Sequence, residues 1–236
     1  MRLPILIENH NRWQRLSLGC LAMAAGYFLT NRFQLSDPKV LPLGPIGQAI
    51  PFLPWTVFVY LTHMPMYLSP YFSEREAKNL NPYLYALIAD IVISCSIFFI
   101  FPTQFPRDAG TFSQLSGLTG LAFELIYAFD QPNNCFPSFH VSLVFLASFY
   151  WIGKSQLKFA LYFFWAVLVA ISTLTTRQHF LIDVCGGYAM AWLLYRFFFH
   201  RRVQYDHRRY ERECRHTLRH DEHRSARYLY RRKWND

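Results

Sequence analysis

The feature that most constrains the fold of this chain is a succession of long apolar stretches. Of its 236 residues, 53% are hydrophobic and 19% are aromatic, which is more apolar surface than a water-soluble core of this size needs. Several stretches approach the length of about 17–25 residues that crosses a bilayer as a helix. We predict six membrane-spanning helices near residues 13–30, 52–68, 82–101, 139–152, 158–173 and 180–200. The predicted fold class is therefore all-α, with residues 1–200 forming one six-span membrane domain.

The basic residues predict how this domain is oriented. With six spans the two termini share a side, and nearly all of the 24 Lys and Arg residues fall on it. The opposite side keeps only Arg32, Lys39, Arg107 and Arg177. Because Lys and Arg accumulate in cytoplasmic loops, we expect both termini to be cytoplasmic. A bacterial inner membrane suits this short chain, although a site facing the Golgi lumen would give the same loop charges.

The ends of the chain carry most of the formal charge of +9. Residues 201–236 form an Arg-rich tail, which we expect to lie in the cytoplasm against anionic lipids of the inner leaflet. The charge is thus explained by topology, and we expect no nucleic-acid partner. Near the N-terminus, Arg12 and Arg15 precede an apolar stretch that also resembles a signal peptide. A retained anchor fits better, because more membrane-like sequence soon follows.

The link between the third and fourth spans contains a further helical pattern. Residues 111–130 mix apolar and polar positions at helical spacing and include Glu124, which argues against a full crossing. We predict an interfacial helix in this outer loop. Two of the five cysteines, Cys135 and Cys185, fall near the outer ends of predicted spans. A disulfide between them and two buried thiols are both compatible with the sequence.

Three polar clusters interrupt the apolar sequence, and the predicted topology places all of them on the outer side. They are FPTQFPR at 101–107, PSFH at 137–140 and STLTTRQHFLID at 172–183. Ionisable groups at membrane depth are costly and usually functional or tightly paired. We therefore predict a polar site where these clusters converge.

His179 and Asp183 form the most specific pair in these clusters. They stand four residues apart, which places them on one face of a helix. A carboxylate that accepts the proton of one ring nitrogen leaves the other nitrogen bare and nucleophilic. The alternative is a structural histidine that the acid merely satisfies.

The PSFH cluster supplies a second histidine at a helix start. Ser138 is placed to cap the helix, and the free amides of its first turn favour an anion nearby. His140 is then suited to protonating a departing oxygen. Arg107 and Arg177 are candidates for gripping phosphoryl oxygens, and their alternative role is to anchor the chain at the interface.

The order of these residues resembles the type-2 phosphatidic acid phosphatase superfamily, which includes the vanadium haloperoxidases. Its phosphatases carry Lys-x6-Arg-Pro, Pro-Ser-Gly-His and Ser-Arg-x5-His-x3-Asp, and the last two motifs match well. The resemblance implies a six-helix membrane core and phosphoryl transfer without metal or cofactor. It also implies that His179 attacks phosphorus to form a phosphohistidine, that Asp183 orients it and that His140 protonates the leaving group. The implied phosphate-binding residues are Arg107, Ser138 and Ser172, and Arg177 is assigned as a substitute for a family cation that this sequence lacks.

The departures from these motifs point to one branch of the superfamily. Ile100 replaces the Lys, Asp108 the Pro, Phe139 the Gly and Thr173 the third-motif Arg. This form is similar to the branch that contains inositol phosphorylceramide synthases, in which the phosphatase cations are missing. The expected substrate is a membrane lipid with a phosphate or phosphodiester headgroup, and the acceptor is water or an alcohol.

Three other functions stay open at this stage. The first is a lipid phosphate monoester phosphatase of the phosphatidic acid or polyprenyl pyrophosphate type. The second is a zinc hydrolase with His140, His179 and Asp183 as ligands. The third is a non-catalytic lipid-binding membrane protein whose site has decayed.

Overall fold

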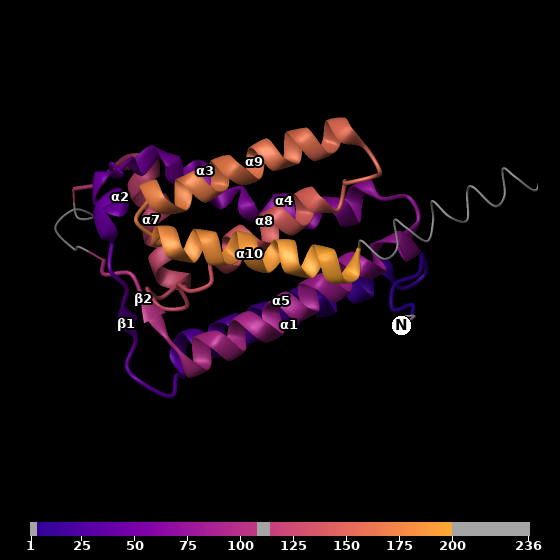
Figure 1. The fold of residues 1–236 in the computed structure, drawn as a ribbon, viewed down its shortest axis with the longest axis horizontal. Coiled ribbons are helices and arrows are strands. Elements are labelled where there is room, and N and C mark those ends of the chain that lie inside the picture. Colours follow the sequence, from indigo (N-terminus) through magenta and orange to yellow (C-terminus); the bar gives the residue numbers. More distant parts are fainter. Residues whose placement is uncertain (1–3, 108–113, 200–236) are drawn as a thin grey trace, which may run out of the picture. The chain divides into compact units, whose positions relative to one another are not determined.

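Helices carry most of the chain in the computed structural model, which describes residues 4–107 and 114–199 (Figure 1). The shorter helices are α2 (Gly44–Ala49), α3 (Val57–Leu61), α4 (His63–Ser73), α7 (Gly117–Phe129) and α8 (Phe139–Phe149). The longer ones are α1 (Arg12–Arg32), α5 (Asn81–Ile100), α9 (Gln156–Thr175) and α10 (Leu181–Phe198). The 3₁₀ turns η1 (Pro54–Thr56) and η2 (Ala77–Leu80) precede α3 and α5.

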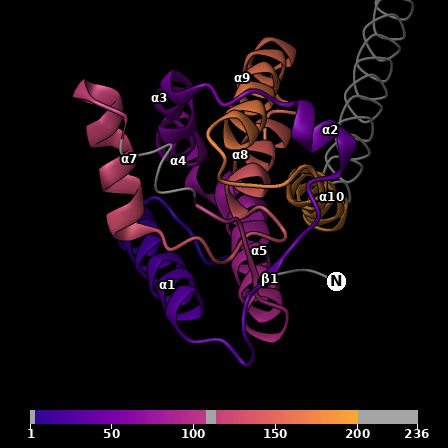
Figure 2. The same ribbon diagram turned by 90° about the vertical axis from the view of Figure 1, so that its left-hand side faces the viewer.

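Helix α8 is the centre around which the other helices pack. Each of its 11 residues is buried, and it contacts α4, α5, α9 and α10 (Figures 1 and 2). Its sequence, FHVSLVFLASF, is apolar on nearly every face, and a helix of this kind is stable only when neighbours surround it. Helix α1 packs along α5. His140 therefore begins a helix that is held on all sides.

The end of the bundle that carries β1, β2, α2 and α7 holds most of the irregular chain (left in Figure 1). Strands β1 (Lys39–Val40) and β2 (Thr103–Gln104) pair in parallel, with Lys39 opposite Thr103. This small pair departs from the all-α prediction. It forms because backbone N–H and C=O groups outside helices also need partners, and the two loops supply them to each other.

Two helices in the described part of the chain are long and apolar enough to cross a membrane. They span Ala77–Ile100, which combines η2 and α5, and Gln156–Thr175, and they overlap the predicted spans 82–101 and 158–173. Helices α7 and α8 are apolar but shorter. Helices α1 and α10 overlap the predicted spans 13–30 and 180–200. The full set of six spans stays a prediction.

The predicted span 52–68 is wrong as one continuous helix, because the chain divides there into η1, α3 and α4. Pro65 has no N–H to donate to the carbonyl of Leu61, so the helical ladder is interrupted between the two helices. Thr62 lies at the junction, and its hydroxyl donates to the carbonyl of Val59 at 2.5 Å. The break turns Tyr60 and His63 toward the interior, where both are buried.

Helix α7 covers most of the predicted interfacial helix 111–130. Residues 111–113 of that prediction and Asp108 lie outside the described residues. The predicted cytoplasmic tail, residues 201–236, lies outside them as well. The described residues up to Phe198 form one compact unit.

A polar clamp joins the end of α4 to the chain after α8, far in sequence from the three polar clusters. Glu74 accepts a hydrogen bond from Lys154 at 2.8 Å and another from the hydroxyl of Tyr150. Burial alone would raise the pKa of Glu74, but the hydrogen bonds from Lys154 and Tyr150 lower it to about 2. The carboxylate therefore stabilises the fold most above its ordinary pKa.

Glu74→Gln is expected to lower the free energy of unfolding at pH 7 by roughly 1 kcal/mol, because it weakens a charge-assisted hydrogen bond. The folded-state pKa of Glu74 is depressed from 4.5 to about 2, so its contribution is lost as the pH falls through this window. Unfolding in detergent at pH 7 and at pH 3 measures both effects. Wild type and Glu74→Gln should converge toward low pH, whereas the exposed control Glu76→Gln should follow wild type at both values.

Candidate active site

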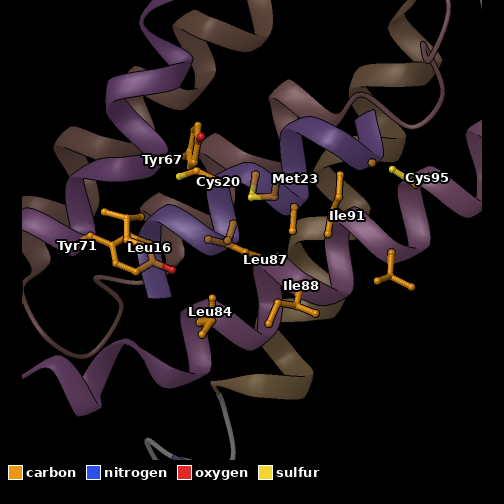
Figure 3. Close-up of a pocket in the computed structure, with 14 residues that line it drawn as sticks. Leu16, Cys20, Met23, Tyr67, Tyr71, Leu84, Leu87, Ile88, Ile91 and Cys95 are labelled. Atoms are coloured by element: carbon orange, nitrogen blue, oxygen red, sulfur yellow. The ribbon is translucent and has the colours of Figure 1, made fainter. Parts of the chain in front are cut away.

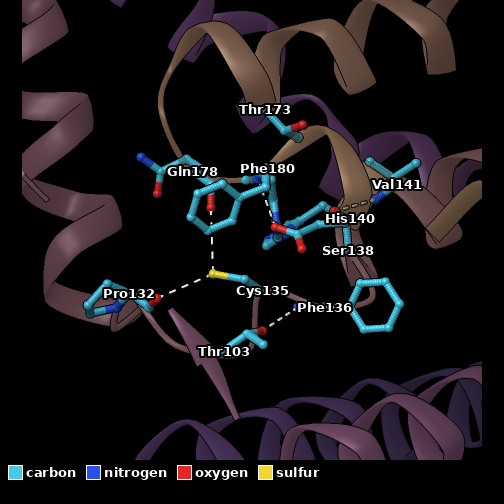
Figure 4. Close-up of polar contacts among 12 residues, drawn as sticks. Thr103, Pro132, Cys135, Phe136, Ser138, His140, Val141, Thr173, Gln178 and Phe180 are labelled. Carbon is cyan, nitrogen blue, oxygen red and sulfur yellow. Dashed lines mark hydrogen bonds and ion pairs between the residues drawn. The ribbon is translucent and has the colours of Figure 1, made fainter. Parts of the chain in front are cut away.

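The three polar clusters come together at one end of α8 (Figure 4). The backbone N–H of Cys135, two residues before the PSFH cluster, donates to the carbonyl of Thr103 at 3.3 Å, which holds the second cluster beside the first. Arg107 donates to the side-chain oxygen of Gln178 at 3.4 Å, which joins the first to the third. The expectation that the clusters converge at one place therefore agrees with the structure.

Ser138 fixes the start of α8. Its hydroxyl oxygen accepts a hydrogen bond from the backbone N–H of Val141 at 3.4 Å, as an N-cap does. Its own backbone N–H donates to the carbonyl of Asp183 at 3.0 Å. One residue thus begins the helix that carries His140 and ties it to α10.

The turn between α9 and α10 places His179. The backbone N–H groups of Gln178 and His179 both donate to the carbonyl of Thr173, at 3.0 and 3.2 Å. Arg177 has φ of 58°, the left-handed conformation that reverses the chain here. His179 lies before α10, which begins at Leu181, so its contact with Asp183 arises across this turn. The predicted pairing on one face of a helix was wrong in this detail.

A glycine in α10 allows the two helix starts to approach. A Cβ atom on Gly187 would lie 2.4 Å from the carbonyl oxygen of Ser138 and 3.0 Å from Cβ of Val141. No side chain fits this space. Gly187 is therefore required for the close packing that brings Asp183 to the base of α8.

The three predicted catalytic residues form a continuous row of contacts. Nδ1 of His140 lies 3.3 Å from Nε2 of His179, and Nδ1 of His179 lies 3.4 Å from Oδ2 of Asp183. Their exposed fractions are 9%, 5% and 0%, respectively. Asp183 is also held by the backbone N–H of Phe180, which donates to Oδ2 at 2.8 Å.

Tyr60 extends the row on the other side of His140. Its hydroxyl lies 2.9 Å from Nε2 of His140. One set of proton positions is compatible with these contacts: Tyr60 donates to Nε2 of His140, Nδ1–H of His140 donates to Nε2 of His179, and Nδ1–H of His179 faces Asp183 without a well-formed hydrogen bond. This set leaves a lone pair on Nε2 of His179 and a proton on His140 directed at it.

Sequence reasoning missed Tyr60, His63 and Tyr27. The ring of His63 meets that of His140 edge-on at 4.6 Å, and the ring of Tyr27 does so at 6.2 Å. His63 had a usable signal, because an ionisable residue inside a predicted span is usually functional. Tyr60 and Tyr27 had none, since tyrosine is common in apolar helices of this composition.

The two predicted arginines lie at a small polar cleft beside His179. Arg107, Arg177, Asp130 and His179 contribute to its lining, and its volume is ≈ 10 Å³, about the room for one water molecule. Arg107 stacks on the ring of Tyr127 with 4.0 Å between its Cζ and the ring centroid. Arg177 donates to the carbonyl of Ile50 at 2.9 Å.

Asp130 gives this cleft a titratable acid. Burial raises the pKa of Asp130 to about 6, against the opposing effect of the hydroxyl of Tyr27, which donates to Oδ1 at 2.9 Å. The carboxyl group faces the same cleft as the two arginines. The sequence analysis did not predict a negatively charged side chain at this cleft.

Ser172 and Thr173 use their hydroxyl groups within α9. Ser172 donates to the carbonyl of Val169 and Thr173 to that of Ala170, each at 2.7 Å. The structure therefore gives Ser172 no direct contact with the histidine row among the described residues. Thr173 acts through its backbone carbonyl, which holds the turn before His179.

Cys135 lies beside the row as a buried thiol. Burial raises the pKa of Cys135 well above its usual range, and the negative charges of Asp183 and Asp130 raise it further. Cys135 and Cys185 are both free, so the structure has no disulfide between them. Among the described residues, one group of potential metal ligands lies close enough together to hold an ion: Cys135, His179 and Asp183. The ligand set considered from the sequence had His140 in place of Cys135.

Comparison with known proteins identifies the family. Residues 77–206 match the model of the PAP2 superfamily. The chain belongs to this superfamily. Phosphatases and phosphotransferases are among its members, and the membership together with the two long apolar helices of the described residues suggests a membrane protein.

One similar protein comes from the archaeon Methanocaldococcus jannaschii. The uncharacterized protein MJ0662 is 31% identical over 83 residues, which cover 33% of this chain. The match spans 34% of the length of that relative. No solved structure matches the chain significantly.

The two serine caps of this fold permit a matched test of the site. Ser138→Ala and Ser155→Ala each remove a cap with the same geometry, since Ser155 accepts from the N–H of Lys158 at 3.4 Å. Both variants are expected to lose about 1 kcal/mol of unfolding free energy. Only Ser138→Ala should also weaken binding of orthovanadate, a phosphate analogue, because it alone loosens the start of the His140 helix. Equal vanadate affinity in the two variants would contradict this role for Ser138.

Proposed function

We propose that this protein is an integral-membrane phosphotransferase that moves a phospho-headgroup between lipids through a phosphohistidine. The observation that carries the proposal is the row of contacts from Asp183 through His179 to His140. A carboxylate, a nucleophilic nitrogen and an acid stand there in the order that the reaction uses them.

In the first half-reaction, Nε2 of His179 attacks phosphorus, and the bond from phosphorus to the leaving alkoxide breaks. Asp183 stabilises the charge that develops on the ring through Nδ1–H. For this step His140 has taken a proton from solvent and is protonated on both nitrogens: its Nε2–H donates to the oxygen of Tyr60, and the proton on Nδ1 passes to the leaving oxygen, which leaves His140 neutral. The phosphoryl group must enter between the two rings, which are 3.3 Å apart at their nearest nitrogens, so substrate binding has to part them.

In the second half-reaction, water or an acceptor alcohol gives its proton to His140 and attacks the phosphohistidine, and the bond from phosphorus to nitrogen breaks. Tyr60 holds Nε2 of His140 by a hydrogen bond at 2.9 Å, so that Nδ1 is the nitrogen that exchanges the proton. No step requires a metal ion or a cofactor.

Arg107 and Arg177 are proposed to bind the non-reacting phosphoryl oxygens from the cleft that they share with His179. Among the described residues, each guanidinium has one hydrogen-bond partner. Arg107 donates to Gln178, and Arg177 donates to the carbonyl of Ile50. The start of α8 adds backbone amides and the helix dipole near the same position. Positioning and charge stabilisation would supply most of the rate.

The sequence departures favour a substrate with less charge at phosphorus than a monoester. Thr173 stands at the position of a motif arginine, and the structure uses it to hold the turn instead. Fewer cations suit a phosphodiester, and hence headgroup transfer of the inositol phosphorylceramide synthase kind. Hydrolysis of a lipid phosphate monoester, of the phosphatidic acid or polyprenyl pyrophosphate type, is the second candidate, because the whole triad is retained.

The six-span arrangement belongs to this proposal, with both termini in the cytoplasm and the site on the periplasmic or lumenal side. The strongest support is the position of the polar clusters, which gather at the end of the bundle where few basic residues occur. The basic tail, residues 201–236, is proposed to contact anionic inner-leaflet lipids.

The purified protein is to be given lipid phosphomonoesters and phosphodiesters with labelled headgroups, with and without alcohols. Transfer predicts label on the alcohol, and a rapid quench into alkaline denaturant, in which the phosphorus–nitrogen bond is stable, should trap labelled phosphohistidine. His140→Ala should lower kcat/KM by about 10²–10⁴-fold, and His179→Ala should lower it further and abolish the trapped species. The exposed His10→Ala serves as control and should behave as wild type.

Other outcomes separate the rival functions. Free phosphate without transfer would select the phosphatase. Loss of activity in excess chelator would select a metal-dependent hydrolase. Turnover by His179→Ala at the wild-type rate would contradict the mechanism. No turnover of any substrate, with no trapped label, would leave a non-catalytic lipid-binding protein.

An apolar cavity supports a lipid substrate. It has a volume of ≈ 280 Å³ and lies between α1, α4 and α5, with Gly19, Ala22 and Gly26 on one side and Leu84 and Ile91 on another (Figure 3). Its lining along α1 extends to Gly26. The next residue, Tyr27, lines the polar cleft at His179. Consecutive residues of α1 thus line the apolar cavity and the cleft of the proposed phosphate site, and we propose that a hydrocarbon chain of the substrate occupies the cavity.

Ala22→Phe is expected to fill part of this cavity and to lower kcat/KM for long-chain substrates by about tenfold, because each methylene excluded costs about 0.8 kcal/mol. Activity on a short-chain, water-soluble analogue should change little. Ala24→Phe is the matched control, since Ala24 is exposed on the same helix and does not line the cavity. An equal effect of Ala22→Phe on both substrates would refute the proposal that the cavity binds a hydrocarbon chain of the substrate.

A further inference from the structure

Two buried polar atoms at the site have no hydrogen-bond partner. They are Nδ1 of His179 and Oδ1 of Asp183, in side chains that are 4% and 0% exposed. Nδ1 approaches Oδ2 of Asp183 at 3.4 Å, which is too long for a well-formed hydrogen bond. Unpaired polar atoms at this depth are costly and often mark the place of an ion or a water molecule.

The sulfur of Cys135 is directed at the same place. One ligand atom from each of Cys135, His179 and Asp183 lies within 4.8 Å of the others, and all three residues are buried. The contacts of the thiol among the described residues are weak: to the carbonyls of Pro132 at 3.3 Å and Gln178 at 3.9 Å (Figure 4), and to that of Asn133 at 4.0 Å. These weak contacts leave the sulfur available to bind a metal ion.

The donor set selects a class of ion. Thiolate, imidazole and carboxylate together suit Zn²⁺, whereas Mg²⁺ and Ca²⁺ prefer oxygen ligands alone. Zinc binds sulfur at about 2.3 Å and nitrogen or oxygen at about 2.0–2.2 Å, so its ligands lie roughly 3.5 Å apart. A separation of up to 4.8 Å therefore requires only a small rotation of these side chains. Three protein ligands also leave the fourth position of a tetrahedral site open.

We propose that Cys135, His179 and Asp183 form a site for one thiophilic divalent cation of the Zn²⁺ type, and that its occupancy inhibits the enzyme. On binding, the thiol loses its proton to solvent, and the sulfur, a ring nitrogen of His179 and a carboxylate oxygen of Asp183 bond to the ion. The ion thereby breaks the pairing of His179 with Asp183 on which nucleophilic attack depends. This goes beyond the proposed reaction, which uses neither the ion nor Cys135.

Cobalt(II) alone, added to the full-length, chelator-stripped protein in detergent, is the probe of binding. A thiolate ligand gives a sulfur-to-cobalt charge-transfer band in the near ultraviolet, and Zn²⁺ should bleach it by displacement. Wild type should show this band, and it should bind one more cobalt per chain than Cys135→Ser. Cys185→Ser and Cys214→Ser are the controls and should keep the band. That result would exclude the exposed thiol of α10 and the cysteine of the His-rich tail as the cobalt ligand.

The inhibition is measured separately, with each variant normalised to its own metal-free rate. Zn²⁺ should inhibit wild type at least tenfold more potently than Cys135→Ser, and Cys135→Ala is carried in parallel in case one variant folds poorly. The band requires no turnover, so failure of the proposed reaction does not affect it. Absence of the band in wild type, its retention in both Cys135 variants, or activation by Zn²⁺ would each overturn the proposal.

Discussion

The close packing of the start of α10 against the start of α8 is the constraint on which the site depends. The backbone N–H of Ser138 donates to the carbonyl of Asp183, and Gly187 removes the side chain that would keep the helices apart. Because α8 is buried on every face, this junction cannot shift without repacking its neighbours. The contacts between His140, His179 and Asp183 follow from the junction, since all three side chains leave the backbone within a few residues of it.

Much of the fold could be predicted from the sequence, because apolar stretches of helical length leave few alternatives. The stretches that became α5 and α9 were found within a few residues of their ends. The prediction of one continuous helix at 52–68 failed, because hydropathy measures how apolar a segment is and not whether its helical hydrogen bonds are continuous. Pro65 breaks that ladder in a segment whose composition hardly changes. The short pairing of β1 with β2 was also unpredictable, since it depends on contacts between distant loops.

The parts of the candidate site that depend on residues close together in the sequence could be predicted. Ser138 as a cap, and the approach of His179 to Asp183, needed only local sequence. Tyr60 could not be found, because its contact with His140 joins residues 80 positions apart. Ser172 was selected through resemblance, and the structure shows its hydroxyl bound within its own helix. Motifs therefore located the side chains that meet in the structure, while the residues that contact them from distant parts of the chain required tertiary structure.

The orienting residues come from a part of the chain outside the superfamily match. Tyr27 and Tyr60 contact His140 from positions before residue 77, where that match begins. The surroundings of His140 are therefore set partly by the first third of the chain. A comparison restricted to the matched region would leave these two side chains out of the description of the site.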